Sequence, residues 1–130
     1  MPADLDAAKY VSFVSSKKNG SPAATAVWIV PFDGGYAFTT DADAWKVKRV
    51  RRNPAVTLTV SDVRGRVAPG AVVHHGRAEV LEADAVRRVD RAIRTKYRVA
   101  YTLMIAPSNL VQRLRGKRDG TGAIKVTLVD

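Results

Sequence analysis

The chain has 130 residues, a length that predicts one domain over 1–130 with a core of its own. It has no cysteine, which excludes disulfides, iron–sulfur clusters and thiol catalysis, and its two histidines are too few for a zinc site, so we expect no metal. The net charge of +10 favours an anionic partner, either nucleic acid, anionic lipid or a small ligand with phosphates or carboxylates.

Neither end nor middle of the chain suggests a membrane protein. No apolar run approaches the roughly 20 residues of a membrane span. The first residues lack the basic and apolar regions of a signal peptide. We therefore expect a cytoplasmic protein with no membrane partner.

Three strands and two turns are predicted in the first 40 residues. Residues 9–16 alternate between polar and apolar, as a half-buried strand does. Residues 18–20 (Lys-Asn-Gly) and 33–35 (Asp-Gly-Gly) tolerate the positive φ of a tight hairpin. Between the turns, residues 23–32 form a long, mostly apolar strand, which we expect to be covered on both faces. Residues 36–40 form the third strand.

A short basic helix is predicted next, from about Asp43 to Asn53. Either Asp41 or Asp43 can cap its first turn. Pro54 ends it, because a residue before proline avoids helical geometry. Its predicted inward-facing residues are Val47 and Val50.

The second half contributes strands at 55–60, 72–81 and 121–129, a helix at 83–98, and a short helix capped by Ser108. The long helix is the clearest, because its apolar residues recur at spacings of three and four. These residues are Val86, Val89, Ile93 and Tyr97. Strands that do not alternate regularly with helices predict a mainly β fold, an antiparallel barrel that is closed or partly closed.

The basic helix and the strand before it predict an anion site. A helix N-terminus offers unpaired N–H groups and a positive dipole end. The hydroxyls of Thr39 and Thr40 precede it, and Lys46 and Lys48 lie in its first turns. Together these groups can satisfy the oxygens of a phosphate. The alternative is that the basic run is a solvated helix face.

Common nucleotide and hydrolase motifs are absent from the sequence. It has no Gly-x-Gly-x-x-Gly loop, no Walker loop and no Gly-x-Ser-x-Gly elbow. No carboxylate pair or histidine triad suggests a catalytic side chain, so we assign none. The aromatic residues are 7% of the chain and are not interleaved with the basic clusters, which disfavours nucleic-acid binding.

Both tryptophans can be interpreted in two ways. Trp28, within the apolar strand, is either a core residue or a wall for a flat ligand. Trp45, beside Lys46, can stack on a ligand or pack on a partner subunit. His74 and His75 point to opposite faces of one strand, so only one can face a pocket.

The order of these motifs resembles the FMN-binding split-barrel superfamily. It is most similar to the branch of actinobacterial deazaflavin-dependent proteins that resemble pyridoxamine-phosphate oxidase. The resemblance covers nearly the whole chain through four segments in the expected order. They are Pro22 to Trp28, Thr39 to Pro54, Asp62 to Arg66, and Lys96-Tyr97.

This resemblance implies a homodimer of six-stranded antiparallel split barrels with a cofactor in each groove between subunits. It implies that Thr39, Thr40 and Lys46, with Lys48 nearby, hold the cofactor phosphate. Val27 and Trp28 would then lie beside the ring system.

The cofactor implied by the resemblance is coenzyme F-420, a deazaflavin, with FMN as the alternative. The implied activity is an oxidoreductase that transfers hydride between the reduced cofactor and a small electron-poor acceptor of unknown identity. A protein that holds a cofactor or nucleic acid without turnover is the other alternative. Two positions depart from the family pattern. Ala44 stands where some relatives have arginine, and Trp45 replaces a small residue, where its side chain can either stack on the cofactor or obstruct it.

Overall fold

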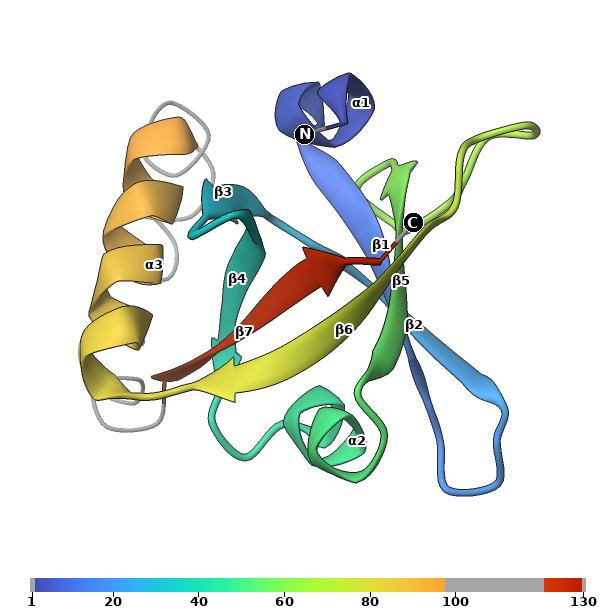
Figure 1. Cartoon of the computed structure of the whole chain (residues 1–130). Helices are drawn as coiled ribbons and strands as arrows, with labels where there is room; N and C mark the ends of the chain where they lie inside the picture. The colour runs from blue at the N-terminus through green and yellow to red at the C-terminus, as the bar shows by residue number, and fades with distance from the viewer. Residues whose placement is uncertain (1, 98–120, 130) are drawn as a thin grey trace.

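The computed structural model describes residues 2–97 and 121–129, which contain seven strands and three helices (Figure 1). The strands are β1 (Tyr10–Ser16), β2 (Pro22–Val27), β3 (Val30–Phe32), β4 (Gly35–Asp41), β5 (Ala55–Ser61), β6 (His74–Leu81) and β7 (Thr121–Leu128). The helices are α1 (Ala3–Ala7), α2 (Trp45–Arg52) and α3 (Ala83–Lys96). All neighbouring strands are antiparallel, in the order β2-β1-β5-β6-β7-β4-β3.

The two edge strands of this sheet are consecutive in the chain. β2 and β3 lie at opposite ends of the strand order, yet only Trp28 and Ile29 separate them. A two-residue link can join the edges only if the sheet curls until they approach each other. The rings of Phe13 on β1 and Phe38 on β4 confirm the curling, because their centroids are 4.8 Å apart across the interior. The mainly β split-barrel fold is therefore confirmed.

The long strand predicted at 23–32 is wrong in two respects. It divides at Trp28 and Ile29, so the sheet has seven strands instead of six. It is also not covered on both faces, because every residue of β2 is exposed or half-buried. The division follows from the link between the two edges, because the chain must end its pairing with β1 before it can pair with β4.

The barrel interior is closed by side chains from the strands and from two helices at its ends. Figure 1 shows α1 and α2 at opposite ends of the curled sheet. Leu5 of α1 is fully buried, and Val47 and Val50 of α2 are buried as predicted. α3 lies outside the barrel against β3, β4 and β7, with Val89 and Ile93 buried beneath it.

Most predicted boundaries of the other elements are confirmed, with small differences. Both hairpin turns use positive φ, at Gly20, Asp33 and Gly34. α3 ends at Lys96 with Tyr97 as its C-cap, and β6 begins at His74, two residues later than predicted. The short helix predicted after Ser108 lies outside the described residues. No helix in the described ranges is long and apolar enough to span a membrane.

The predicted carboxylate cap of α2 is wrong. The N-cap is Ala44, and no side chain caps the helix. Asp41 is not the cap because it is still paired with Thr121 in the β4–β7 ladder, and its carbonyl oxygen accepts the Ala44 N–H in the following turn. Asp43 precedes the N-cap residue, so the first turn of α2 has no acidic side chain.

The hairpin between β3 and β4 gives a first test of the fold. A β-carbon at Gly35 would overlap the backbone carbonyl of Val126 on β7, whereas a β-carbon at Gly34 would meet open space. We expect Gly35→Ala to lower the free energy of unfolding by more than about 2 kcal/mol, because backbone atoms must move. The control Gly34→Ala should cost about 1 kcal/mol, since only its positive φ of 82° is affected. Equal losses in urea denaturation would contradict the described β4–β7 register.

Candidate functional site

The seven residues predicted to bind a cofactor lie in two regions of the barrel. Thr39, Thr40, Trp45, Lys46 and Lys48 lie where β4 ends and α2 begins. Val27 and Trp28 lie at the bend between β2 and β3.

An open stretch of the barrel separates these two regions. β3 pairs with β4 only as far as Val30 and Ala37. Beyond that point the chain turns away to pair as β2 with β1, so Thr39 and Thr40 have ladder partners only on β7 among the described residues. The split in the barrel thus runs between β2 and the end of β4.

Thr39 and Thr40 point to opposite faces of β4. Side chains alternate along a strand, and Thr40 shares the interior face with Phe38 and Tyr36. Thr39 shares the outer face with Ala37, on the side that α3 covers. Both threonines are half-buried. One hydroxyl, not both, can therefore face a ligand on a given side of the strand.

Lys46 is the half-buried cation of this region. Burial lowers the pKa of its ammonium, and the nearby Arg49 lowers it further. The carboxylate of Asp41, at the end of β4, acts in the opposite direction. Lys46 makes no hydrogen bond or ion pair within the described ranges. A half-buried ammonium without a bound partner is suited to an anion.

Trp45 stands beside Lys46 and is 68% exposed. The ammonium of Lys48 lies 4.6 Å from the centroid of its ring, a distance typical of a cation–π contact. Such an exposed tryptophan is not a core residue of the described chain, which leaves a ligand or a partner subunit as its predicted contact.

Val27 and Trp28 belong to the bend and are packed differently. Val27 lies opposite Val11 and faces the edge of the core. Trp28 is partly buried and stacks on Tyr97, with ring centroids 4.5 Å apart and an angle of 4° between the planes. One face of the indole is therefore already occupied by a side chain of α3's C-cap.

The hydrogen bonds to the carbonyl oxygen of Ile29 are not predictable from the sequence pattern. This oxygen accepts hydrogen bonds from Lys96 Nζ at 2.8 Å and from Tyr97 Oη at 3.0 Å. Burial raises the pKa of the Tyr97 phenol to about 12, so it remains a donor. The helical pattern predicted Tyr97 only as an apolar contact of α3, and no periodic signal marks a carbonyl at a strand bend.

The two histidines have different surroundings, as the strand alternation predicted. His74 Nε2 lies 2.9 Å from a carboxylate oxygen of Asp4 on α1. His75 is exposed on the outer face of the sheet. No group of three or more metal-ligating side chains occurs among the described residues.

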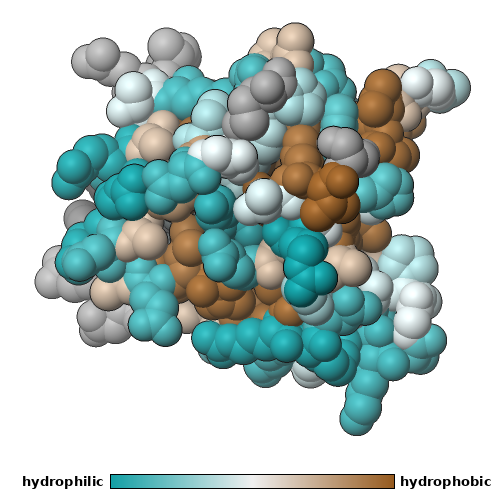
Figure 2. Space-filling model, viewed as in Figure 1, coloured by the Kyte–Doolittle hydropathy of each residue, from teal (hydrophilic) through white to brown (hydrophobic). Residues whose placement is uncertain are grey.

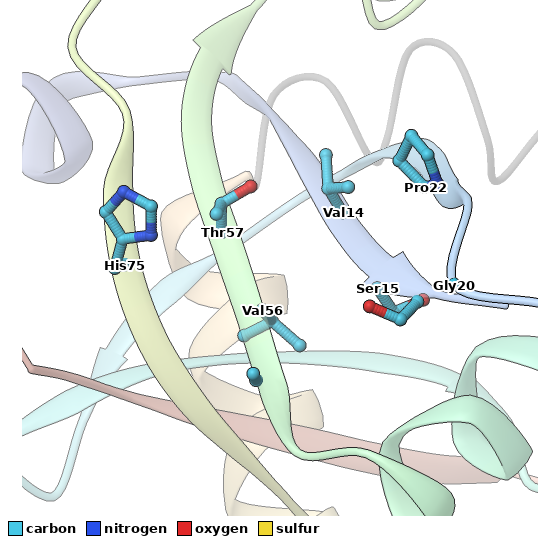
Figure 3. Close-up of a pocket in the computed structure, with 9 residues that line it drawn as sticks. Val14, Ser15, Gly20, Pro22, Val56, Thr57 and His75 are labelled. Atoms are coloured by element: carbon cyan, nitrogen blue, oxygen red, sulfur yellow. The ribbon is translucent and has the colours of Figure 1, made fainter.

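A shallow hollow of about 250 Å³ lies near His75 (Figure 3). Val14, Thr57 and His75 line it from three adjacent strands, at one register level. None of the seven predicted site residues contributes to it. Val56 and Ser15, whose buried hydroxyl has no described partner, also line the hollow. The hollow is therefore separate from the split described above.

Residues 3–120 of the chain match a known protein family. The family model described as pyridoxamine 5'-phosphate oxidase matches residues 3–120. The chain belongs to this family. The resemblance to the FMN-binding split-barrel superfamily is thereby confirmed at the level of the superfamily. No curated protein matches the chain.

Solved structures of the same fold accompany this family match. A conserved hypothetical protein from Mycobacterium tuberculosis has a TM-score of 0.70 at 22% identity, covering 97% of this chain and 76% of that one. An F-420 reductase has a TM-score of 0.67 at 19% identity, covering 97% and 90%. A heme storage protein from Vibrio cholerae has a TM-score of 0.67 at 12% identity, covering 97% and 85%. At these identities the likeness shows the shared fold of this pyridoxamine 5'-phosphate oxidase family member.

The burial of Lys46 predicts a gain in stability when its charge is removed. A lysine with a lowered pKa binds its proton more weakly in the folded state than in the unfolded state, so its charge opposes folding. We expect Lys46→Met to raise the melting temperature by about 1–3 °C at pH 7. The gain should shrink as the pH rises through the lowered pKa toward the usual value of 10.5.

The exposed Lys48 provides the matched control for this measurement. Lys48→Met should change the melting temperature by less than about 1 °C at either pH. Scanning calorimetry at pH 7 and pH 10 distinguishes the two variants. A loss of stability in Lys46→Met at pH 7 would contradict the described burial of the ammonium.

Proposed function

We propose that this protein is an oxidoreductase that uses the deazaflavin coenzyme F-420, with FMN as the rival cofactor. The observation that carries the proposal is the half-buried Lys46, which lacks a bound partner in the described ranges and lies beside the strand end that the barrel split leaves open. Family membership supports a flavin-type cofactor, and the F-420 reductase of the same fold supports the deazaflavin.

The residues at the split suit a phosphate and a flat ring. Lys46 would supply a charge-assisted hydrogen bond to phosphate oxygens, and either Thr40 or Thr39 would add a hydroxyl. Burial strengthens that contact, because less water competes for the ammonium. Val27 and Trp28 would limit the ring at the opposite border of the split. Trp45 and Lys48, exposed at the start of α2, would contact the tail or a partner subunit.

The chemistry would belong to the cofactor, and the chain would supply position and charge. When bound in its reduced form, a deazaflavin would supply hydride-transfer chemistry toward an electron-poor acceptor. No described side chain is assigned as an acid or base, so solvent would supply any proton. The roles of the chain's own residues are to hold the phosphate, to orient the ring and to exclude water beside Trp28.

Nucleic-acid binding is less well supported by the arrangement of the arginines. Three arginines of α3 are already paired with carboxylates, since Arg87 contacts Asp84, Arg88 contacts Asp33 and Arg94 contacts Asp90. These pairs reduce the positive field that a phosphate backbone would meet.

A cofactor-holding protein without turnover is the second candidate function. The heme storage protein of the same fold favours it, because this fold also serves storage in that protein. A turnover assay with reduced F-420 and a panel of quinones, enones and tetrapyrroles separates the two candidates. Oxidation of the cofactor by a member of the panel supports the oxidoreductase.

Cofactor binding tests the proposal directly. We expect F-420 or FMN to bind with a dissociation constant below about 100 μM, which is about 5 to 6 kcal/mol. Lys46→Ala should weaken binding about 10- to 100-fold, because it removes a charge-assisted hydrogen bond of about 1.5–3 kcal/mol. Fluorescence titration measures both values.

Lys18→Ala, at an exposed lysine of the β1–β2 hairpin, is the control, with an expected change of less than about threefold. Failure of both cofactors to bind at that concentration would overturn the proposed function. If both alanine variants weaken binding equally, Lys46 does not hold the cofactor phosphate.

We also propose that the protein is a homodimer with the cofactor grooves between subunits. The outer face of β2, β1, β5 and β6 has no covering helix in Figure 1, and the β5–β6 loop approaches this face where Gly65 lies near Ala26 of β2. Figure 2 shows apolar surface where that loop lies. Its exposed valines are Val63, Val67, Val72 and Val73, and each is at least 43% exposed.

Light scattering tests the dimer. We expect a mass of twice the 14.1 kDa chain, and we expect Thr57→Arg, in the hollow of the outer face, to shift the protein toward the monomer. The control Thr95→Arg adds the same charge to exposed α3 and should leave the dimer intact. A wild-type protein that is monomeric at micromolar concentration would contradict this proposal.

A further inference from the structure

The bend between β2 and β3 is the point where the chain leaves one edge of the sheet for the other. Ile29 is only 1% exposed there. No backbone donor in the described part of the chain reaches its carbonyl oxygen. A buried carbonyl needs hydrogen-bond donors, and two side chains from the end of α3 provide them.

Three elements meet at the phenol of Tyr97. Its hydroxyl lies 3.0 Å from the carbonyl oxygen of Ile29 and 3.4 Å from that of Ala8, which follows α1. Its ring stacks on the ring of Trp28. The ring centroid of Tyr10, on β1, lies 6.3 Å from that of Trp28. The phenol is 4% exposed, so these contacts are made in the interior.

Lys96 adds a charged donor to the same oxygen. Its ammonium lies 2.8 Å from the Ile29 carbonyl and 5.1 Å from the centroid of the Tyr97 ring. Burial lowers the pKa of Lys96, and the carboxylate of Asp6 opposes this change. The two hydrogen-bond donors and the stacked ring therefore restrain the backbone direction at Trp28 and Ile29.

We infer that Lys96 and Tyr97 are positioning residues, which fix the direction in which Trp28 and Val27 leave the bend and thereby set the width of the barrel split. The inference rests on the proposed function only where it concerns a cofactor in that split. The direction of the bend itself is a property of the chain alone.

The test uses Trp28 as the only tryptophan, in a Trp45→Phe parent. The variants are Lys96→Met with Tyr97→Phe, which removes both donors but keeps the stacked ring, and Lys96→Arg, which keeps a donor. Thr95→Ala is the control in the same turn of α3. Hydrogen exchange of residues 26–31 and the emission spectrum of Trp28 are measured without cofactor.

We expect the double variant to exchange at least about tenfold faster at residues 26–31 and to shift the emission of Trp28. Lys96→Arg and Thr95→Ala should match the parent in both measurements. A double variant that matches the parent overturns the inference. A uniform increase in exchange across all strands also overturns it, because that result indicates general destabilisation.

A cofactor titration of the same proteins separates this inference from the proposed function. With a parent that binds F-420 or FMN, the double variant should bind at least about fivefold more weakly. Unchanged binding would show that the bend does not set the split, which overturns the inference. A parent that binds neither cofactor overturns the proposed function, while exchange and emission still decide the inference.

Discussion

The structure depends on one covalent constraint, the two-residue link between the opposite edges of its sheet. Trp28 and Ile29 connect β2 to β3, so the sheet must curl until these edges meet. The curling encloses the contact between Phe13 and Phe38, and it leaves open ends that α1 and α2 fill. Because β2 pairs with β1 while β3 pairs with β4, the barrel is split beside the end of β4.

The same constraint creates the candidate site and also two groups whose burial opposes folding, an ammonium and a backbone carbonyl. At the split, the polar end of β4 lies beside Lys46, whose burial lowers its pKa. At the bend, the carbonyl of Ile29 requires donors from outside the sheet, and α3 supplies them through Lys96 and Tyr97. A buried charge without a bound partner opposes folding, and functional sites commonly combine such a cost with a ligand that compensates it.

Much of the fold could be predicted from the sequence, because its signals are local. Asn-Gly and Asp-Gly-Gly mark the hairpins, apolar periodicity marks α3, and Pro54 marks the end of α2. The division of residues 22–32 could not be predicted, since an uninterrupted apolar strand and a strand that changes partner midway have the same composition. The cap of α2 was mispredicted because the β4–β7 ladder, a long-range contact, keeps Asp41 in the strand.

The candidate site was predictable by type and less so by geometry. The basic run identified Lys46, but sequence alone could not show that Lys46 is half-buried while Lys48 lies over Trp45. The sequence also predicted Thr39 and Thr40 in one phosphate site, whereas their side chains lie on opposite faces of β4. The support that α3 gives to the bend comes from hydrogen bonds of Lys96 and Tyr97 to Ile29. These partners are separated by 67 and 68 positions in the chain, so no local pattern reveals the contacts.

The central claim is that the split beside β4 is a cofactor site whose phosphate is held by Lys46. A crystal structure of the protein with F-420 or FMN bound tests it most directly. We expect the cofactor phosphate within hydrogen-bond distance of Lys46 Nζ and the ring system bordered by Val27 and Trp28. A cofactor bound elsewhere, with Lys46 free of its phosphate, would contradict the account.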